Sequence, residues 1–490
     1  MKQRTMTIFG GRVALLAAVL GGAFGGFATG ALGQDEGQSG GRDGVRGDSG
    51  HGDGHELKTT FSDEPSPMRI EDVPDRPRPI LELGDPFLGE GPIGRGFVTP
   101  TGAVWQPSLV VFGQYRSALQ TFNDGEETFT EWVNRLDVFA NLQLSGTERV
   151  LVGLRPLDQD NEFTGYFFEP DGARQSGWDD GANGEITHLF FEGDFGEVFP
   201  GLDPQDRGQL DLGFSVGRQP LFYQEGLLIN DRVDAVGITK NSIFIKGFSN
   251  LQVTALYGWN EVNRGNNVED DKAHLFGFFA EADTGSSTLN LDAVYIYDND
   301  FRKDNTDALF LAGSAVQRIG KVNTSFRALT SIPLDEESAV TGRGALLFTE
   351  LAYTPAHSVD ILYFNGFWAI DEFSSAARGP STGGPLGRTG LLFAAVGLGR
   401  YGAPLGNDAQ HAVGAALGYQ HFFNEKRSQI VVEAGFRSDT KDSDQGAVAI
   451  ASRFETAIGR NNILRLDAFI AGQESRGPAS GARVEWLIKF

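Results

Sequence analysis

The final residues of the chain alternate between apolar and charged side chains. Across 483–490 every second residue is apolar, ending on the aromatic Phe490, and only Leu487 departs from the alternation. Because successive side chains of a strand point to opposite faces, this segment predicts a strand with one apolar face and one charged face. Such a strand suits the last strand of a membrane β-barrel, with lipid outside and water inside. The alternative is an amphipathic strand of a soluble sandwich.

The same alternation recurs along most of the chain after residue 100. Clear alternation predicts strands at 135–145, 209–216, 251–259, 289–297, 430–437, 448–455 and 464–470. Less regular apolar runs suggest further strands at 275–280, 346–353 and 391–396. No long stretch shows the three-to-four residue periodicity of an amphipathic helix. The pattern therefore predicts an all-β fold.

The length of the strand-rich region sets the number of strands. A transmembrane strand takes about 9–11 residues, and a strand with its connection takes roughly 20–24. Residues 101–490 then accommodate roughly 16–18 strands, and an even number is expected if both ends of the barrel lie on one side of the membrane. We expect a transmembrane antiparallel β-barrel of about 18 strands, with 16 as the alternative.

The first hundred residues differ from the rest. Residues 1–33 combine early positive charges with an apolar run and small residues, which is typical of a secretory signal peptide. Residues 34–100 are rich in Gly and Pro and poor in large apolar side chains, so we expect a largely disordered periplasmic extension, or alternatively a plug in the lumen. His51 and His55 lie in this glycine-rich tract, and we expect no metal site there.

Composition narrows the class of protein. No eighteen consecutive residues are apolar, which excludes a helical membrane protein. The chain has no cysteine, which excludes a disulfide scaffold, and its net charge of −24 opposes nucleic-acid binding. Many aromatic residues lie near predicted strand ends, as expected for the interfacial belts of a membrane protein.

A charge pattern, Arg-x-Asp or Arg-x-Glu, recurs on the polar faces of the predicted strands. Because antiparallel neighbours run in opposite directions, an Arg on one strand can stand beside an acid on the next. We therefore expect a ladder of alternating charge on the inner wall, which either braces the wall or acts on solute. The candidate pore-lining residues are Arg135, Asp137, Glu433, Arg437, Arg453, Glu455, Arg465, Asp467, Arg483 and Glu485.

A short segment resembles the alginate-export family. The residues that carry the resemblance are Gly217-Arg218-Gln219 at a strand end and the run Asn-Asp-Arg-Val-Asp-Ala-Val at 230–236. The resemblance implies an 18-stranded outer-membrane channel for an anionic polysaccharide or another solute, and adds Arg218, Arg232 and Asp234 as residues of the lumen or its mouth. By parity with 210–216, however, Arg218 should face lipid unless it lies at the membrane interface or Gly217 introduces a bulge.

From the sequence we expect an outer-membrane channel for hydrophilic solutes in a Gram-negative-type envelope, with an anionic polysaccharide or another carbohydrate as a candidate solute. We expect no enzymatic activity and no cofactor. The expected partners are outer-membrane lipid, the solute, and the barrel-assembly machinery, which would act through the C-terminal strand. Two alternatives are a membrane-embedded barrel hydrolase, disfavoured by seven scattered histidines, and an exported soluble adhesive all-β protein.

Overall fold

The computed structural model describes most of the chain after residue 77. The described residues are 78–84, 96–159, 161–169, 176–202, 204, 208, 210–265, 267–298, 306–334, 338, 340–441 and 445–490. The predicted signal peptide and residues 34–77 and 85–95 of the predicted extension lie outside them. In this part of the chain no helix is both long and apolar enough to cross a membrane.

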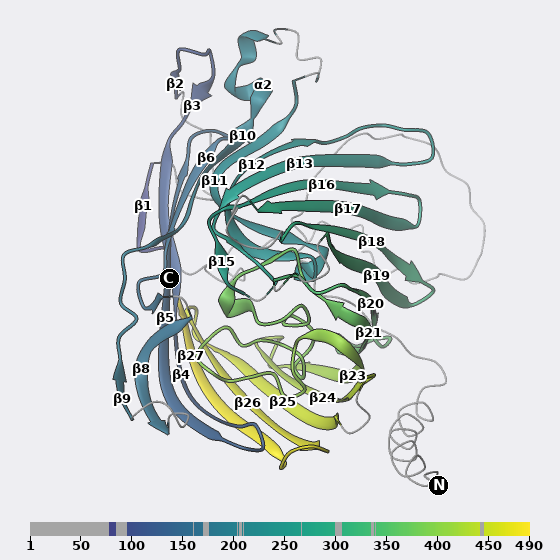
Figure 1. The fold of residues 1–490 in the computed structure, drawn as a ribbon. Coiled ribbons are helices and arrows are strands. Elements are labelled where there is room, and N and C mark those ends of the chain that lie inside the picture. The colour runs from purple at the N-terminus through teal and green to yellow at the C-terminus, as the bar shows by residue number, and fades with distance from the viewer. Residues whose placement is uncertain are drawn as a thin grey trace, which may run out of the picture.

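Eighteen antiparallel strands form a closed ring, as predicted (Figure 1). In ring order they are β4 (Ser108–Asn123), β5 (Thr128–Gln143), β6 (Arg149–Leu154), β10 (Ile186–Asp194), β11 (Gly213–Tyr223), β12 (Ile229–Lys240), β13 (Asn250–Asn260), β16 (Ala273–Asp283), β17 (Ser287–Asp298), β18 (Ala308–Ile319), β19 (Val322–Pro333), β20 (Gly344–Tyr353), β21 (Ile361–Phe373), β23 (Ala409–Phe423), β24 (Ser428–Asp439), β25 (Gly446–Ile458), β26 (Asn462–Gln473) and β27 (Ala479–Lys489).

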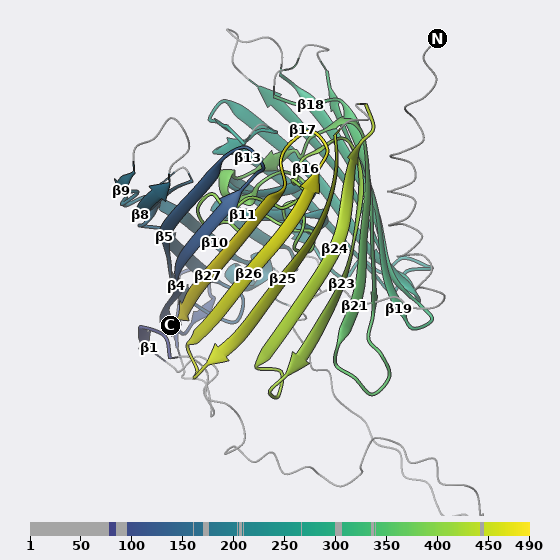
Figure 2. The same cartoon turned by 90° about the horizontal axis from the view of Figure 1, so that it is seen from below.

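The ring closes between its last and first strands. β27 pairs antiparallel with β4, and Figure 2 shows the two side by side in a continuous wall that runs on to β24. At the seam, the Phe490 amide donates to the Gly113 carbonyl at 3.1 Å, and the Gly113 amide donates back at 2.8 Å. We call the end of the barrel where β4 begins and β27 finishes the terminus end, and the opposite end the far end.

The two faces of the wall have the predicted chemistry. On β27, Val484 and Trp486 are 49% and 40% exposed on the outside, whereas Arg483 and Glu485 are buried inside. Leu487, which breaks the alternation in the sequence, also points inward and is 7% exposed. The outer face is therefore apolar, as contact with hydrocarbon requires, and the inner face carries the charges.

The predicted strands are confirmed, with one exception. Residues 391–396 form no strand; they belong to a long connection between β21 and β23 that folds into the ring. Their apolar run reflects burial on all sides, since Leu392 and Phe393 are fully buried, and not the one-sided burial of a wall strand. The predicted strand at 209–216 begins four residues later, at Gly213, as β11.

Several short strands and helices are not part of the ring of eighteen strands. They are β1 (Leu81–Leu83), β2 (Phe97–Val98), β3 (Val104–Trp105), β7 (Asp158–Gln159), β8 (Glu162–Glu169), β9 (Gly177–Asp179), β14 (Val262–Asn263), β15 (Glu269–Asp270), β22 (Ala377–Arg378), α2 (Phe195–Val198), η2 (Pro200–Leu202), η3 (Gln224–Gly226) and η4 (Pro380–Thr382). β1 pairs with the first residues of β4, below Phe490 at the seam. β8 pairs with the far half of β5, above the short strand β6.

The tip of the β11–β12 hairpin lies inside the barrel. The ring of Tyr223 stacks on Phe279 of β16, and the Gln224 amide donates to Asp292 of β17 at 2.7 Å. Phe279 and Asp292 both belong to the buried, inward rows of their strands. The hairpin therefore leaves the wall and bends into the lumen, where its tip packs on the inner face of β16 and β17.

Candidate functional site: a charged lumen wall and an inward-folded segment

A ladder of ion pairs follows the inner face of β25, β26 and β27. Asp467 of β26 pairs with Arg453 of β25 and with Arg483 of β27, each at 2.6 Å. One step along the strands, Arg465 pairs with Glu455 at 2.5 Å and with Glu485 at 3.3 Å. The cross-strand ladder predicted from the sequence is confirmed by these contacts.

The ladder continues across the seam into the first strands. Arg116 of β4 pairs with Glu485 of β27 at 2.6 Å. On β5, Asp137 accepts from Arg135 at 3.0 Å and from Arg155, in the turn after β6, at 2.9 Å. The sequence did not single out Arg116 or Arg155, because their partners are found only once the ring is closed and β6 is seen to end early.

Burial determines what these pairs contribute. The side chains of Arg483 and Glu485, which contact each other, are fully inaccessible to solvent. A buried ion pair gains little net stability, because desolvation offsets the attraction, but removing one partner typically costs about 3–5 kcal/mol. The most buried rungs therefore brace the wall, and only the more accessible charges, such as Arg453 and Arg465, can act on a solute.

A long connection between β21 and β23, residues 374–408, lies inside the ring, where Figure 1 shows it in green at the centre. We call it the inner segment. Its strand β22 runs parallel to the start of β12, with Ile229 opposite Ala377. Its remaining residues form the short helix η4 and irregular backbone, so side chains of the wall must satisfy many of its peptide groups.

Glu433 of β24 holds one part of the inner segment. Its buried carboxylate accepts hydrogen bonds from the backbone amides of Leu391 at 3.0 Å and Leu392 at 2.8 Å, and from the Tyr363 hydroxyl at 2.5 Å. Gly390 has a φ of +55°, and a Cβ there would lie 2.4 Å from the Glu433 carboxylate. Only glycine allows the backbone to approach this acid so closely.

Glu131 of β5 holds a second part in the same way. The Arg400 amide donates to the Glu131 carboxylate at 2.6 Å. Gly399 has a φ of +63°, and its Cβ would lie 2.2 Å from the same carboxylate. Nearby, Arg135 donates to the Gly397 carbonyl at 2.9 Å. Wall charges of both signs thus bind the peptide groups of the inner segment.

The opposite side of the inner segment contacts the β11–β12 hairpin. Arg378 donates to the Gly226 carbonyl of the hairpin and to the Pro385 carbonyl, the latter at 3.2 Å. Burial lowers the pKa of Arg378 to about 9. The Ser375 hydroxyl donates to the Leu227 carbonyl at 2.7 Å. The segment is thus fixed both to the hairpin and to the facing wall, and it narrows the lumen.

Arg437, the last of the predicted residues on β24, holds the end of the inner segment. Its guanidinium donates to the Asp408 carboxylate at 2.7 Å and to the Asp408 carbonyl at 3.0 Å. Glu433 and Arg437 therefore lie on one face of β24, as the sequence suggested, but their partners belong to the inner segment. The sequence did not predict that Glu433 and Arg437 hold the inner segment. Gly390, where the backbone approaches Glu433, cannot be distinguished in the sequence from an ordinary turn glycine.

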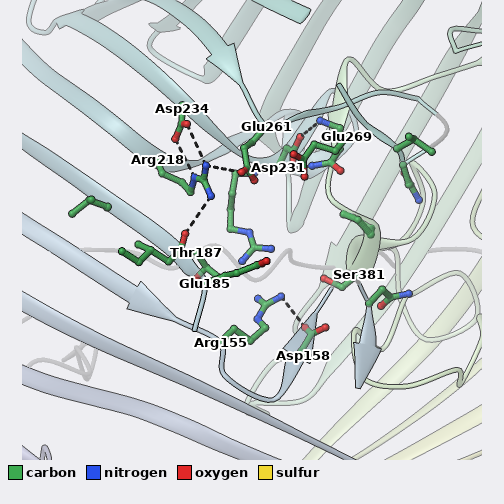
Figure 3. A pocket seen from close by; sticks show the side chains of 18 of the residues that line it. Arg155, Asp158, Glu185, Thr187, Arg218, Asp231, Asp234, Glu261, Glu269 and Ser381 are labelled. Atoms are coloured by element: carbon green, nitrogen blue, oxygen red, sulfur yellow. Dashed lines mark hydrogen bonds and ion pairs between the residues drawn. The ribbon is translucent and has the colours of Figure 1, made fainter. Parts of the chain in front are cut away.

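Arg218, Arg232 and Asp234 lie apart from the ladder. They occupy outward positions of β11 and β12, yet they line a cavity of about 1040 Å³ together with Arg155, Asp158 and Ser381 (Figure 3). Arg218 pairs with Asp234 at 3.0 Å and with Glu261 at 2.6 Å. Burial raises the pKa of the Glu261 carboxyl, although the neighbouring Arg218 opposes the shift.

A second cavity, of about 650 Å³, lies at the terminus end of the lumen. Its lining includes Gln219 and Leu221, inward residues of β11, and Thr239 of β12. The β11–β12 hairpin therefore separates the two cavities. In the described part of the chain no three His, Asp or Glu side chains are arranged to hold a metal ion.

Comparison with solved structures identifies the fold. The outer membrane protein OpdK of Pseudomonas aeruginosa matches with a TM-score of 0.52 and 10% identity, covering 78% of this chain and 98% of that protein. OccK2 (OpdF) of the same organism matches with a TM-score of 0.51 and 11% identity, covering 81% and 99%. Wzi of Escherichia coli, a carbohydrate-binding outer membrane barrel, gives a TM-score of 0.47 and 10% identity, covering 77% and 84%.

No protein-family model matches the sequence, and no curated protein matches it. The comparisons therefore establish the fold and leave the alginate-export resemblance without specific support. A closed antiparallel ring with an apolar exterior and a charged interior defines the chain as an outer-membrane β-barrel.

Proposed function

We propose that this barrel is a channel for hydrophilic solutes across the outer membrane. The observation that carries the proposal is a closed ring with apolar side chains outside and a charged wall inside, narrowed by the inner segment. Rings of this size leave an aqueous interior unless something fills it. Here the segment fills only part of it, since the cavity of about 650 Å³ remains at the terminus end.

The charges on the wall favour weak ion selectivity. Acids and arginines alternate along the ladder from Arg453 to Asp137, so neither sign dominates the inner surface. Selectivity in a pore follows the charge that faces the solute at its narrowest part. Size exclusion by the inner segment would therefore discriminate between solutes more strongly than charge does.

The solute and the partners of the barrel are also part of this proposal. Passage of an anionic polysaccharide is suggested by the resemblance to the alginate-export family, whereas a lumen narrowed by the inner segment favours a small solute. Outer-membrane lipid would surround the exposed apolar rows, and the barrel-assembly machinery would act through the C-terminal strand.

Swelling of proteoliposomes tests the proposed function. Vesicles containing the refolded barrel are diluted into isotonic glucose, glucuronate, or oligomers of each with increasing length. We expect uptake of both monosaccharides at similar rates, falling with chain length. Rapid uptake of long acidic oligomers would favour the polysaccharide, and no uptake of any solute by folded protein would overturn the channel.

A further inference from the structure

The barrel wall is interrupted beside β11. β10 pairs with β11 only as far as Arg218. Beyond that point, residues 219–223 pair on one side only, with β12. On the other side of the interruption, β9 pairs with β8 and, within the described residues, with no other strand. An unpaired strand edge inside hydrocarbon would be costly, so the interruption must face protein or water.

Glycine and the inward hairpin produce this interruption. Gly217 has a φ of +121°, and a Cβ at this position would lie 2.2 Å from the Leu189 carbonyl of β10. Immediately after it, β11 leaves β10 and continues into the lumen, where the hairpin tip meets β16 and β17. Between β9 and β13, the far half of the wall is therefore open, because β11 and β12 bend into the lumen there and do not continue in the wall.

At the level of Gly217, the side chains on the outer face of β11 and β12 change from apolar to charged. Below it, Val216 and Ile238 are apolar and 41% and 51% exposed, as expected of lipid-facing positions. Above the outward pair Val216 and Val236, the next outward positions are Arg218 on β11 and Asp234 and Arg232 on β12. These three charged side chains line a polar space.

That space is the cavity of about 1040 Å³, which reaches from the wall to the interior. Its lining combines Arg218 of the wall with Arg155 after β6 and with Pro380 and Ser381 of the inner segment (Figure 3). It begins at the level of an aromatic belt, which is formed here by the neighbouring rings of Trp259, Tyr257 and Phe276, because Asp234 is in register with Asn260, next to Trp259. The inner segment itself occupies the centre of the ring at the far end.

The cations of the cavity are not equivalent. Arg155 is held by Asp137 and Asp158, and Arg218 by Asp234 and Glu261. Arg232 also lines the cavity, but within the described residues no acid forms an ion pair with it. Among the described residues of this cavity, its charge is thus the one that no ion pair already neutralises.

We propose that this cavity is a side port, the outer mouth of the channel, through which hydrophilic solute passes between the lumen and the outer surface at the level of the aromatic belt. The proposal rests on the proposed function and adds the route. The solute would pass beside Arg232 and Ser381, around the β11–β12 hairpin, and not along the centre of the far end.

Cysteine modification tests the route, because the natural chain contains no cysteine. The variants are Arg232→Cys and Ser381→Cys in the cavity, and Arg476→Cys as the control. Arg476 lies in the β26–β27 connection at the far end, and its side chain is 45% exposed. Each folded variant is inserted in a planar bilayer and treated with the anionic reagent 2-sulfonatoethyl methanethiosulfonate.

We expect modification of either cavity variant to lower the conductance at least twofold and to shift the reversal potential toward cation selectivity, while modified Arg476→Cys stays unchanged. Having two cavity variants on different elements guards against misfolding of one. If the wild type conducts and only the control responds, or none responds, the side port is wrong and the channel stands. If the folded wild type does not conduct, the proposed function itself fails.

Discussion

At the scale of single residues, the structure depends on carboxylates that each serve several partners. Glu485 is fully buried and contacts Arg116, Arg465 and Arg483. Glu433 is equally buried and serves two backbone amides and a tyrosine hydroxyl. In a low-dielectric interior such groups are costly when they lose a partner, so their removal should have large effects.

Glu485→Gln should destabilise the barrel by about 3–5 kcal/mol, because three arginines would then share a buried site without its charge. Urea unfolding of the protein refolded in lipid vesicles measures the change. Glu425→Gln, in the exposed turn between β23 and β24, is the matched control and should unfold at the wild-type urea concentration. Equal midpoints for both variants would show that the ladder is not structurally important.

At the scale of elements, the β11–β12 hairpin and the inner segment are the two parts that leave the wall. Gly217 marks the point where β11 separates from β10, while Glu131 and Glu433 anchor the inner segment. Changes at these positions should affect one element without removing the ring.

Gly217→Ala should impair folding, because the added Cβ meets the Leu189 carbonyl and the positive φ alone costs about 1–3 kcal/mol. Gly213→Ala on the same strand is the control, since its Cβ would find its nearest atom 3.8 Å away. Heat-modifiable migration on gels reports the folded fraction. A folded fraction of Gly217→Ala equal to that of the control would contradict the tight approach of β11 to β10.

Glu433→Gln should release the inner segment, since hydrogen bonds to a charged group contribute about 1.5–3 kcal/mol. The segment contains Arg388 and Arg400, which are trypsin sites. We expect folded Glu433→Gln to be cleaved within 374–408 faster than wild type, with Glu425→Gln as the control. Identical cleavage rates would show that this carboxylate does not hold the segment.

The sequence predicted the wall because every wall strand has one face in hydrocarbon. Apolar residues therefore occur at every second position of these strands. It also predicted the ladder, since Arg453 and Asp467 are register neighbours on consecutive strands. It missed what is inside the ring. The apolar run at 391–396 resembles a short buried strand in sequence, because Leu392 and Phe393 within it are buried on all sides. The Arg116–Glu485 pair joins residues 369 positions apart and requires the closed ring.

At the scale of the whole molecule, closure of the ring depends on the last residue. Phe490 completes the pairing of β27 with β4 through two hydrogen bonds to Gly113. β1 pairs with β4 directly below it, so the N-terminal part of the described chain also contributes to the seam. The ring is therefore closed by β27 and β4, and β1 extends the pairing of β4 beyond Phe490.

Deletion of Phe490 should lower the amount of folded barrel in the outer membrane several-fold, because it removes the seam contacts and the terminal aromatic that we propose the assembly machinery uses. Quantification of heat-modifiable protein in outer-membrane fractions measures this. Lys489→Gln keeps the backbone pairing and should assemble normally. Normal assembly of the deletion would show that the terminal residue is dispensable.

Single-channel conductance tests the account most directly. The wild type is compared with a variant lacking 385–406, in which Gly384 joins Asn407; these residues are already adjacent, since the Gly384 amide donates to the Asn407 side chain at 2.8 Å. We predict small, stable channels for the wild type and a severalfold larger conductance for the deletion. Equal conductances, or none from either folded protein, would contradict a water-filled lumen narrowed by the inner segment.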